Sequence, residues 1–295
     1  MKNIAVIGAG TMGNGIAHSF AQNGFKVALV DTNEEVLGNA LKIIQQNLER
    51  QVKKGLITPE IQSKTILLIE SFTSIEKAVQ KADLVVEAVS EAPTLKKSIF
   101  EELDKQCPEA CILATNTSSI SITQIASYTQ RPEKVIGMHF MNPVPVMKLV
   151  EIIKGYSTSE ETYQAVHAYT KALDKIPVVV NDYPGFIANR ILMPMINEAI
   201  ISLFEGVAGV AEIDAIMKLG MAHPMGPLQL ADFIGLDTCL SILKVLYDGF
   251  KNPKYAPCPL MVNMVQAGKL GVKSGEGFYS YAKGSKEAEV SQRFR

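Results

Sequence analysis

The feature that most constrains the fold is a glycine-rich turn close to the amino terminus. The turn, Gly8-Ala9-Gly10-Thr11-Met12-Gly13, follows a short apolar run, Ile4 to Ile7, and opens a helical stretch. A lone GxGxxG pattern is weak evidence, but here a strand, a helix and a second strand surround it. In such a turn the first two glycines let the backbone approach a pyrophosphate, while the helix N-terminus offers free N–H groups. The third glycine, Gly13, lets the helix pack closely on the strand. The sequence therefore predicts a dinucleotide-binding βαβ unit.

An acidic residue, Asp31, ends the second predicted strand, 18 residues after Gly13. A carboxylate at this place accepts hydrogen bonds from both hydroxyls of the adenosine ribose and repels a 2′-phosphate. The pattern therefore favours NAD over NADP. The alternative is a glycine-rich turn followed by a surface aspartate, but the coincidence of turn, helix and acid favours the cofactor site.

The first half of the chain alternates short β-branched runs with helical segments. This alternation is typical of repeated βαβ units and predicts an α/β fold with a doubly wound, mostly parallel sheet. The predicted strands are Asn3–Ile7, Lys26–Val30, Thr65–Ile69, Leu84–Ala88, Cys111–Thr115 and Val135–His139, with Leu149–Ile153 and Pro177–Val180 as later additions.

The pattern changes after the segment Asn181-Asp182-Tyr183-Pro184-Gly185. The stretch Phe186–Phe204 is apolar almost all round, which indicates a helix buried on most sides, and no convincing strand follows before about residue 270. We therefore expect a sheet domain over residues 1–183 and an all-α C-terminal domain over residues 184–282. Residues 283–295 have no apolar periodicity and are expected to form a frayed tail.

The overall composition excludes several classes of protein. The chain of 295 residues has 29 basic and 30 acidic side chains and a formal net charge of -1, so no basic field for nucleic acid is expected. No apolar window reaches the roughly 18 residues that a membrane span requires, and Ile4–Ile7 is too short for a signal peptide core. We expect a cytoplasmic protein without a metal site. The cysteines form no CxxC pair and are expected to be reduced core thiols: Cys107, Cys111, Cys239 and Cys258.

A long amphipathic helix is predicted from Glu34 to Lys54. A Thr32-x-x-Glu35 capping box opens it and Gly55 closes it. Near its end Arg50 and Lys54 are four residues apart and share a face, for which a solvated charged surface is the default interpretation. The predicted apolar face consists of Leu37, Leu41, Ile44, Leu48 and Val52.

Two polar segments follow predicted strands, where a doubly wound sheet binds its ligands. They are Asn116-Thr117-Ser118-Ser119 and His139-Phe140-Met141-Asn142-Pro143. Twelve residues after His139, Glu151 lies within an apolar run. Burying a polar group without a partner costs roughly 2–7 kcal/mol, so this carboxylate needs a partner. His139 is an available partner. A carboxylate that stabilises the imidazolium raises the histidine pKa, which suits proton exchange with a hydroxyl near neutral pH.

Other polar residues leave more than one interpretation open. His139 could be a structural histidine at a strand end, although Glu151 and the glycine turn favour chemistry. His18 and His167 lie on helical segments and are interpreted as structural or surface residues. Asn189, near the start of the apolar helix, is either a helix-start polar group or a donor that faces the active cleft.

Taken together, six motifs in order carry a family resemblance: GAGTMG, NTSS, HFMNPVPVMKLVE, DYPGFIANR, HPMGPLQLADFIGLD and KSGEGFY. Over residues 1 to about 281 the chain resembles the short-chain L-3-hydroxyacyl-CoA dehydrogenase family, most closely its bacterial 3-hydroxybutyryl-CoA dehydrogenases. The resemblance implies a Rossmann-type N-terminal domain, a helical domain through which homodimers form, NAD as cofactor and an acyl-CoA thioester as substrate. The implied reaction is reversible oxidation of an (S)-3-hydroxyacyl-CoA to the 3-ketoacyl-CoA.

The resemblance also implies roles for individual residues. His139 matches the catalytic base and Glu151 the carboxylate that orients it. Ser118 and Asn189 match residues that contact the 3-oxygen and thioester region of the substrate. Arg50 and Lys54 match basic positions that meet coenzyme A, which replaces the default interpretation of that face. The positions that match the NAD site are Glu91, Lys96, Asn116, Ser118 and Asn142, with Asp31 and the glycine turn.

The chain departs from the family pattern at two of these places. After Glu91 the family usually has a polar residue such as Asn, whereas this chain has Ala92-Pro93, and position 50 is Arg where related enzymes often have Lys. Two other functions stay open: an NAD-binding structural protein of the crystallin type, and a dehydrogenase of a free hydroxy acid. Retention of His139 and Glu151 argues against the first, and the basic pair on the long helix argues against the second.

Overall fold

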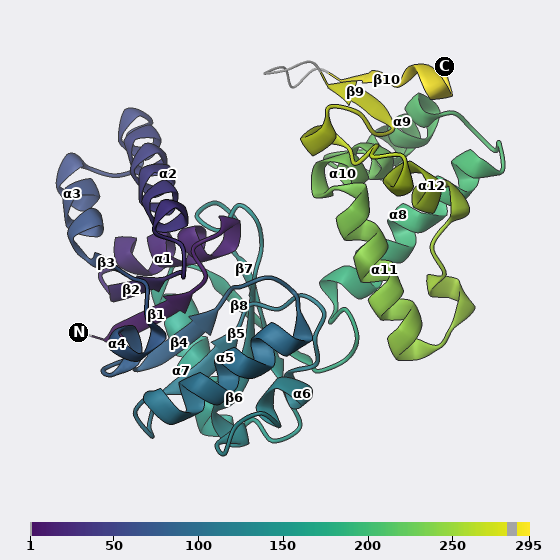
Figure 1. Cartoon of the computed structure of the whole chain (residues 1–295). Helices are drawn as coiled ribbons and strands as arrows, with labels where there is room; N and C mark the ends of the chain where they lie inside the picture. Colours follow the sequence, from purple (N-terminus) through teal and green to yellow (C-terminus); the bar gives the residue numbers. More distant parts are fainter. Residues whose placement is uncertain (1, 282–287) are drawn as a thin grey trace. The chain divides into compact units, whose positions relative to one another are not determined.

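The computed structural model describes residues 2–281 and 288–295 (Figure 1). Its contacts divide the chain into two compact units, residues 1–183 and 184–295. The division falls at the Asn181–Gly185 segment, where the alternation of strands and helices ends. Of the expected tail, residues 283–287 lie outside the described part of the chain.

The first unit contains an eight-stranded sheet with the order β3-β2-β1-β4-β5-β6-β7-β8. Neighbouring strands are parallel except β6 and β7, which are antiparallel. The predicted doubly wound, mostly parallel sheet is confirmed, and its strand order reverses beside β1, where such sheets bind ligands. The strands are β1 Asn3–Ile7, β2 Lys26–Val30, β3 Ile69–Phe72, β4 Leu84–Glu87, β5 Ile112–Thr115, β6 Val135–Phe140, β7 Leu149–Lys154 and β8 Ile176–Asn181.

Helices connect these strands and cover the sheet. Apolar side chains of the first, second and seventh helices pack with one face of the strands into a single buried cluster that includes Phe20, Leu48 and Val166. This packing fixes the carboxyl ends of the central strands relative to one another. The helical elements are α1 Thr11–Gln22, α2 Glu34–Lys53, α3 Pro59–Leu67, α4 Ile75–Val79, α5 Pro93–Gln106, α6 Ile122–Ala126, η1 Pro132–Lys134 and α7 Glu160–Ala172.

The prediction for the third strand was wrong in position. The segment Thr65–Ile69 was expected to be a strand, but its first three residues end α3, and β3 begins only at Ile69. Thr58 caps the helix with its hydroxyl oxygen, and Pro59 occupies the first turn, where its fixed φ favours helix. Thr65 satisfies its buried hydroxyl by donating to the Ile61 carbonyl, so the helix start outweighs the β-branched composition.

The long helix α2 ends one residue before its predicted end and has a different N-cap. Asn33, not Thr32, is the N-cap, and its side chain accepts a hydrogen bond from Glu35 N at 2.8 Å. The predicted capping box was therefore one residue out. The helix is followed by Gly55, whose φ of +67° suits a residue without a Cβ. The buried face consists of Leu37, Ala40, Ile44 and Leu48, while Leu41 and Val52 are half-buried.

The second unit is helical, as predicted, except for a short β-ribbon. Strands β9 Tyr279–Tyr281 and β10 Ala288–Val290 form this antiparallel pair. No described helix in either unit is both long and apolar enough to cross a membrane. The helices are α8 Ala188–Phe204, α9 Val210–Gly220, α10 Pro227–Ile234, α11 Leu236–Phe250, η2 Pro253–Tyr255, α12 Pro259–Gln266, η3 Val272–Ser274 and η4 Gln292–Phe294.

The expectation of a frayed tail was wrong for residues 288–295. Val290 and Phe294 pack against the core of the second unit, and the Phe294 ring lies 5.7 Å from that of Phe278. Ser291 is buried and donates its hydroxyl to Glu276. Ala288, Val290 and Phe294 lie among polar and charged residues and form no periodic pattern, so no local pattern predicts this packing.

Candidate active site

The glycine turn has the geometry that close approach of a ligand to the backbone requires. Gly8 has a φ of +97°, and a Cβ on Gly13 would lie 1.7 Å from the Gly8 carbonyl oxygen. A Cβ on Gly10 would meet no atom within 4 Å, so the space beside this residue is open. Gly10 is also the N-cap of α1 and brings no side chain to its N–H groups. An anion such as a pyrophosphate fits this helix start.

Asp31 connects the end of β2 to the glycine turn. Its carboxylate accepts hydrogen bonds from Ala9 N at 2.9 Å and from Asn33 N at 3.1 Å. Beside it lies a cavity of about 510 Å³, which is lined by Gly8, Gly10 and Asp31, by apolar side chains and by polar residues that include Glu102. A slot with an acid at its edge and apolar walls suits an adenosine, so the residues present fit NAD. The apolar walls include Val30, Val36, Ile75, Val89, Leu95 and Ile99.

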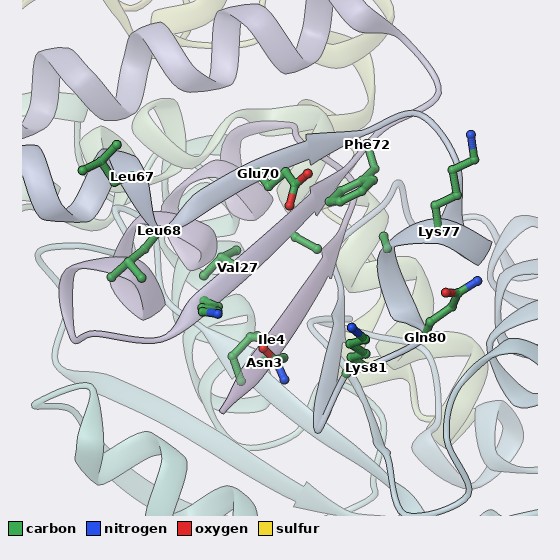
Figure 2. A pocket seen from close by; sticks show the side chains of 14 residues that line it. Asn3, Ile4, Val27, Leu67, Leu68, Glu70, Phe72, Lys77, Gln80 and Lys81 are labelled. Carbon is green, nitrogen blue, oxygen red and sulfur yellow. The ribbon is translucent and has the colours of Figure 1, made fainter. Parts of the chain in front are cut away.

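A second cavity, of about 500 Å³, lies away from this edge (Figure 2). It lies beside α4 and β3, and its lining includes Asn3 and Lys26, the first residues of β1 and β2. Glu70 and Lys77 also line it. None of the predicted site residues lines this cavity, so it is separate from the candidate site.

The antiparallel pairing of β6 and β7 brings His139 and Glu151 together. The two residues are direct partners in the register of the strands, which explains how side chains twelve positions apart meet. His139 Nδ1 lies 2.8 Å from Glu151 Oε2, and both residues are buried. An Nδ1–H that donates to a carboxylate fixes the ring and its tautomer. The arrangement can hold and release a proton at the other ring nitrogen, Nε2.

The polar segment after β5 is tied to its neighbours on both sides. Asn116 accepts a hydrogen bond from Phe140 N at 2.9 Å, which links the ends of β5 and β6. Ser118 donates to Glu91 Oε1 through its backbone N–H at 2.6 Å and its hydroxyl at 2.9 Å. Asn142 follows β6 and precedes a cis peptide bond to Pro143. The structure thus brings Asn116, Ser118 and Glu91 to the edge of the sheet that carries His139.

Comparison with known proteins agrees with this geometry. The family model of the 3-hydroxyacyl-CoA dehydrogenase NAD-binding domain matches residues 3–183, and that of the C-terminal domain matches residues 185–281. The chain belongs to the 3-hydroxyacyl-CoA dehydrogenase family. It is 53% identical to a probable 3-hydroxybutyryl-CoA dehydrogenase of Bacillus subtilis over 95% of this chain and 98% of that protein.

Two further relatives also match this chain over nearly its whole length. A 3-hydroxybutyryl-CoA dehydrogenase of Bradyrhizobium diazoefficiens is 50% identical over 95% of this chain and 96% of that protein. The crystal structure of an (S)-3-hydroxybutyryl-CoA dehydrogenase from Ralstonia eutropha matches with a TM-score of 0.92 and 47% identity, covering 96% and 99% of the two chains. The similarity therefore spans both units of this 3-hydroxyacyl-CoA dehydrogenase family member.

The edge of the sheet that carries His139 also has a buried carboxylate, Glu87, which was not predicted from the sequence. Glu87, the last residue of β4, is fully buried, and both its oxygens accept from Lys96 Nζ, at 2.7 and 2.9 Å. It also accepts from the Thr115 hydroxyl and from Val89 N, each at 2.7 Å. The signal was present, because Glu87 closes an otherwise apolar strand in the way that Glu151 interrupts another.

Lys96 and Glu91 continue this cluster. Lys96 is only 1% exposed, and its Nζ lies 3.3 Å from Glu91 Oε2, so the ammonium contacts carboxylates rather than solvent. Burial raises the pKa of Glu91, but the charge of Lys96 and hydrogen bonds from Ser118 and Thr117 outweigh it, and the net pKa is lowered. Glu91 is therefore a carboxylate at neutral pH. At the departure from the family pattern, Ala92 is the N-cap of α5 and supplies no side-chain cap.

The residues predicted to bind substrate are on two different units. Arg50 and Lys54 are exposed at the end of α2, and Arg50 Nη1 lies 3.4 Å from Asn47 Oδ1. Asn189 is buried on the first turn of α8 in the second unit. Among the described residues no cluster of His, Cys, Asp or Glu has the arrangement of a metal site.

The remaining histidines of the first unit lie on helices, as the sequence indicated. His18 is fully buried on α1, and burial lowers its pKa to about 4, with the charge of Lys175 acting in the same direction. His167 is half-buried on α7, where its ring lies 5.7 Å from that of Tyr163. Among the described residues, neither histidine has a carboxylate partner of the kind that His139 has.

Proposed function

We propose that this protein catalyses the reversible NAD-linked oxidation of (S)-3-hydroxyacyl-CoA, with 3-hydroxybutyryl-CoA as substrate, to the 3-ketoacyl-CoA. The observation that carries the proposal is the His139–Glu151 contact, on the sheet whose first strand leads into the glycine turn. Two relatives that match over nearly their whole length, at 53% and 50% identity, are named as a probable 3-hydroxybutyryl-CoA dehydrogenase and a 3-hydroxybutyryl-CoA dehydrogenase, which supports the proposal.

The chemistry follows from the orientation of the imidazole. With Nδ1–H donating to Glu151, the lone pair of neutral His139 is at Nε2, where it can accept the proton of the 3-hydroxyl. NAD, when bound, supplies the acceptor for the hydride that leaves C3. In the reverse direction the imidazolium returns the proton to the 3-oxygen. The buried carboxylate stabilises the imidazolium that exists between these events.

Two further residues complete the proposed assignments. Ser118 is held by Glu91 through its backbone and its hydroxyl, which suits a residue that must present a donor to the 3-oxygen at a fixed place. Asn189 is assigned to the thioester region. Arg50 and Lys54 are assigned to coenzyme A, whose phosphates suit exposed cations. Asn116 and Asn142 complete the proposed cofactor side.

The test is the loss of nicotinamide absorbance when acetoacetyl-CoA is mixed with NADH, in parallel with NADPH and with free acetoacetate. Rapid NADH oxidation confined to the thioester is the expected result. Turnover of free acetoacetate at a similar rate would favour the dehydrogenase of a free hydroxy acid. NADH binding without turnover of either substrate would favour the structural protein, and preference for NADPH would overturn the role of Asp31.

We infer further that the chain works as a homodimer through its second unit. Large apolar side chains of α8 and α9 and their connection are exposed, among them Val207, which is 73% exposed, and Leu219, which is 87% exposed. Several large exposed apolar side chains on neighbouring segments of the chain favour a protein interface. A mass measured in solution by light scattering at twice that of the chain is expected, and a monomer at micromolar concentration would contradict the inference.

The compartment is proposed from the state of the cysteines. All four are buried free thiols, the state that a reducing compartment maintains. We therefore place the protein in the cytoplasm. Detection of the tagged protein in an oxidising compartment of its native cell would contradict this.

A further inference from the structure

A buried trio of charges lies under the proposed cofactor side of the site. Glu87 and Lys96 are 0% and 1% exposed, and Glu91 contacts Lys96 from the outer side. The three N–H donors of the ammonium are matched by three carboxylate oxygens, two from Glu87 and one from Glu91. The ammonium of Lys96 is therefore held by the carboxylates of Glu87 and Glu91. Its influence on a bound ligand comes through Glu91 and through its own charge.

The strand register places this trio close to His139. Glu87 is paired with Thr115 on β5, and Thr115 is paired with Gly137 on β6, two residues before His139. Proton and hydride leave the 3-oxygen and C3 of the same substrate, so the nicotinamide must lie beside the group that His139 serves. Glu91 reaches the same edge, since it holds the Ser118 segment that follows β5.

The charge of the trio distinguishes the two forms of the cofactor. Two carboxylates and one ammonium carry one net negative charge, and the nicotinamide ring is a cation in NAD⁺ but neutral in NADH. We propose that Glu87 is a positioning residue that, with Lys96 and Glu91, provides the negative charge favouring NAD⁺ over NADH at this site. The proposal rests on the proposed function only in placing the nicotinamide beside His139.

The geometry also predicts an effect on Ser118. In the intact trio Glu87 holds Lys96 with two contacts, while Glu91 directs its Oε1 to Ser118. Without the charge of Glu87 the ammonium has only Glu91 as an anionic partner, and Glu91 is drawn away from Ser118. A variant of Glu87 is therefore expected to lower turnover as well as to change cofactor preference.

The test uses two variants and one control. Glu87→Gln keeps the shape and an acceptor for Lys96, and the Thr115 hydroxyl can rotate to accept from the new amide. It changes the net charge of the trio from −1 to 0. The double variant Glu87→Gln with Lys96→Gln returns the net charge to −1 and leaves no unpaired buried cation. Asp104→Asn is the control, because Asp104 is on the same helix and in a half-buried ion pair with Arg131.

The measured quantity is the ratio of the dissociation constants of NAD⁺ and NADH, without substrate. NADH binding is followed by its own fluorescence, and NAD⁺ binding by competition with NADH. We expect the ratio to rise about 3- to 10-fold in Glu87→Gln, as screened Coulomb interactions over several ångströms predict. We expect the double variant and Asp104→Asn to stay within about twofold of the unchanged protein, since their net charge at the trio is unchanged.

Two results would overturn the proposal. If Glu87→Gln weakened both forms of the cofactor equally, Glu87 would have only a structural role. If the double variant behaved like Glu87→Gln, charge would not be the cause. Failure of the proposed function gives a different pattern, in which acetoacetyl-CoA is not reduced by the unchanged protein while the ratio still shifts.

Discussion

The two units of this molecule bury carboxylates to the same degree but provide them with different partners. In the first unit Glu87 and Glu151, 0% and 3% exposed, contact the ionisable groups of Lys96 and His139. Such pairs hold charge that can respond to a ligand or a proton. Both lie on interior strands of the sheet, Glu87 on β4 and Glu151 on β7.

In the second unit Asp214 and Asp232, 2% and 1% exposed, accept hydrogen bonds from backbone N–H groups and tyrosine hydroxyls instead. Asp214 accepts from Leu228 N and Gln229 N, each at 2.9 Å, at the start of α10, and from the Tyr279 hydroxyl at 2.8 Å. These partners do not titrate near neutral pH. The aspartates therefore connect helix starts and β9, and stabilise the fold.

The surroundings of the aspartates agree with a structural role. A Cβ on Gly226 would lie 2.1 Å from Asp214 Cγ, and one on Gly277 would lie 1.9 Å from Asp232 Oδ1. Both glycines thus leave room for a carboxylate to reach the backbone. The comparison teaches that the burial of an acid does not identify a site, whereas the chemistry of its partner does.

The largest effect that tests this difference between the units is expected at His139. His139→Gln removes the imidazole, and turnover of acetoacetyl-CoA should fall by about 10² to 10⁴, the usual contribution of general acid–base catalysis. The melting temperature should change little, and NADH affinity should be kept. Near-full turnover would remove the distinction between the units.

Glu151→Gln should lower turnover more than it lowers NADH affinity, and an equal loss of both would indicate a folding role.

The second prediction concerns stability. Asp214→Ala leaves two N–H donors and a hydroxyl without their acceptor, so the free energy of unfolding of the second unit should fall by about 3 kcal/mol. Urea unfolding, monitored by hydrogen exchange in peptides of that unit, measures this loss of stability. Glu205→Gln, an exposed acid at the end of α8, is the control and should have little effect. A small loss in Asp214→Ala would contradict the structural role.

The third prediction uses pH to separate the units. His18 has its pKa lowered to about 4 by burial, so the folded first unit binds fewer protons than the unfolded chain between pH 4 and 6.5. Stability is then lost as the pH falls, by about 2 kcal/mol between pH 7 and 5. His18→Gln should remove this part of the loss.

Asp232 should respond in the opposite direction. Burial raises its pKa to about 6, against hydrogen bonds that lower it, so the folded second unit binds the proton more tightly. Between pH 7 and 5 its stability should rise by about 1 kcal/mol, and Asp232→Asn should remove the rise. Hydrogen exchange of peptides from each unit at the two pH values, corrected for intrinsic rates, measures both effects. A loss of equal size in both units, unchanged in the variants, would contradict the assignment.

The sequence was sufficient where local pattern and tertiary structure agree. The strand–glycine turn–helix unit and Asp31 were predictable because short-range geometry fixes them. The His139–Glu151 contact was predictable as a pair because an acid in an apolar strand needs a partner. Its geometry required the register of β6 and β7, which no local pattern specifies.

The wrong or missing predictions have different physical causes. The position of β3 was missed because Thr58 and Pro59 start a helix that outweighs β-branched residues. The packing of Val290 and Phe294 depends on a core assembled from distant segments. Glu87 was overlooked because its partner Lys96 was assigned to the cofactor, and only the structure shows that the ammonium contacts Glu87 and Glu91.

The smallest predicted effect concerns charge that is not buried at all. Arg50 is exposed, so Arg50→Ala should raise the KM for acyl-CoA by about 3- to 5-fold and keep turnover, because an exposed ion pair contributes about 1 kcal/mol or less. Lys42→Ala, which removes an equal exposed charge from the same helix, is the control and should leave KM unchanged.

The effect of Arg50→Ala should shrink at about 0.5 M salt, where screening acts within a few ångströms. Salt should not diminish the effect of Glu87→Gln to the same extent, because its partners are excluded from solvent. Equal salt sensitivity of both variants would mean that burial does not protect the charges of the first unit.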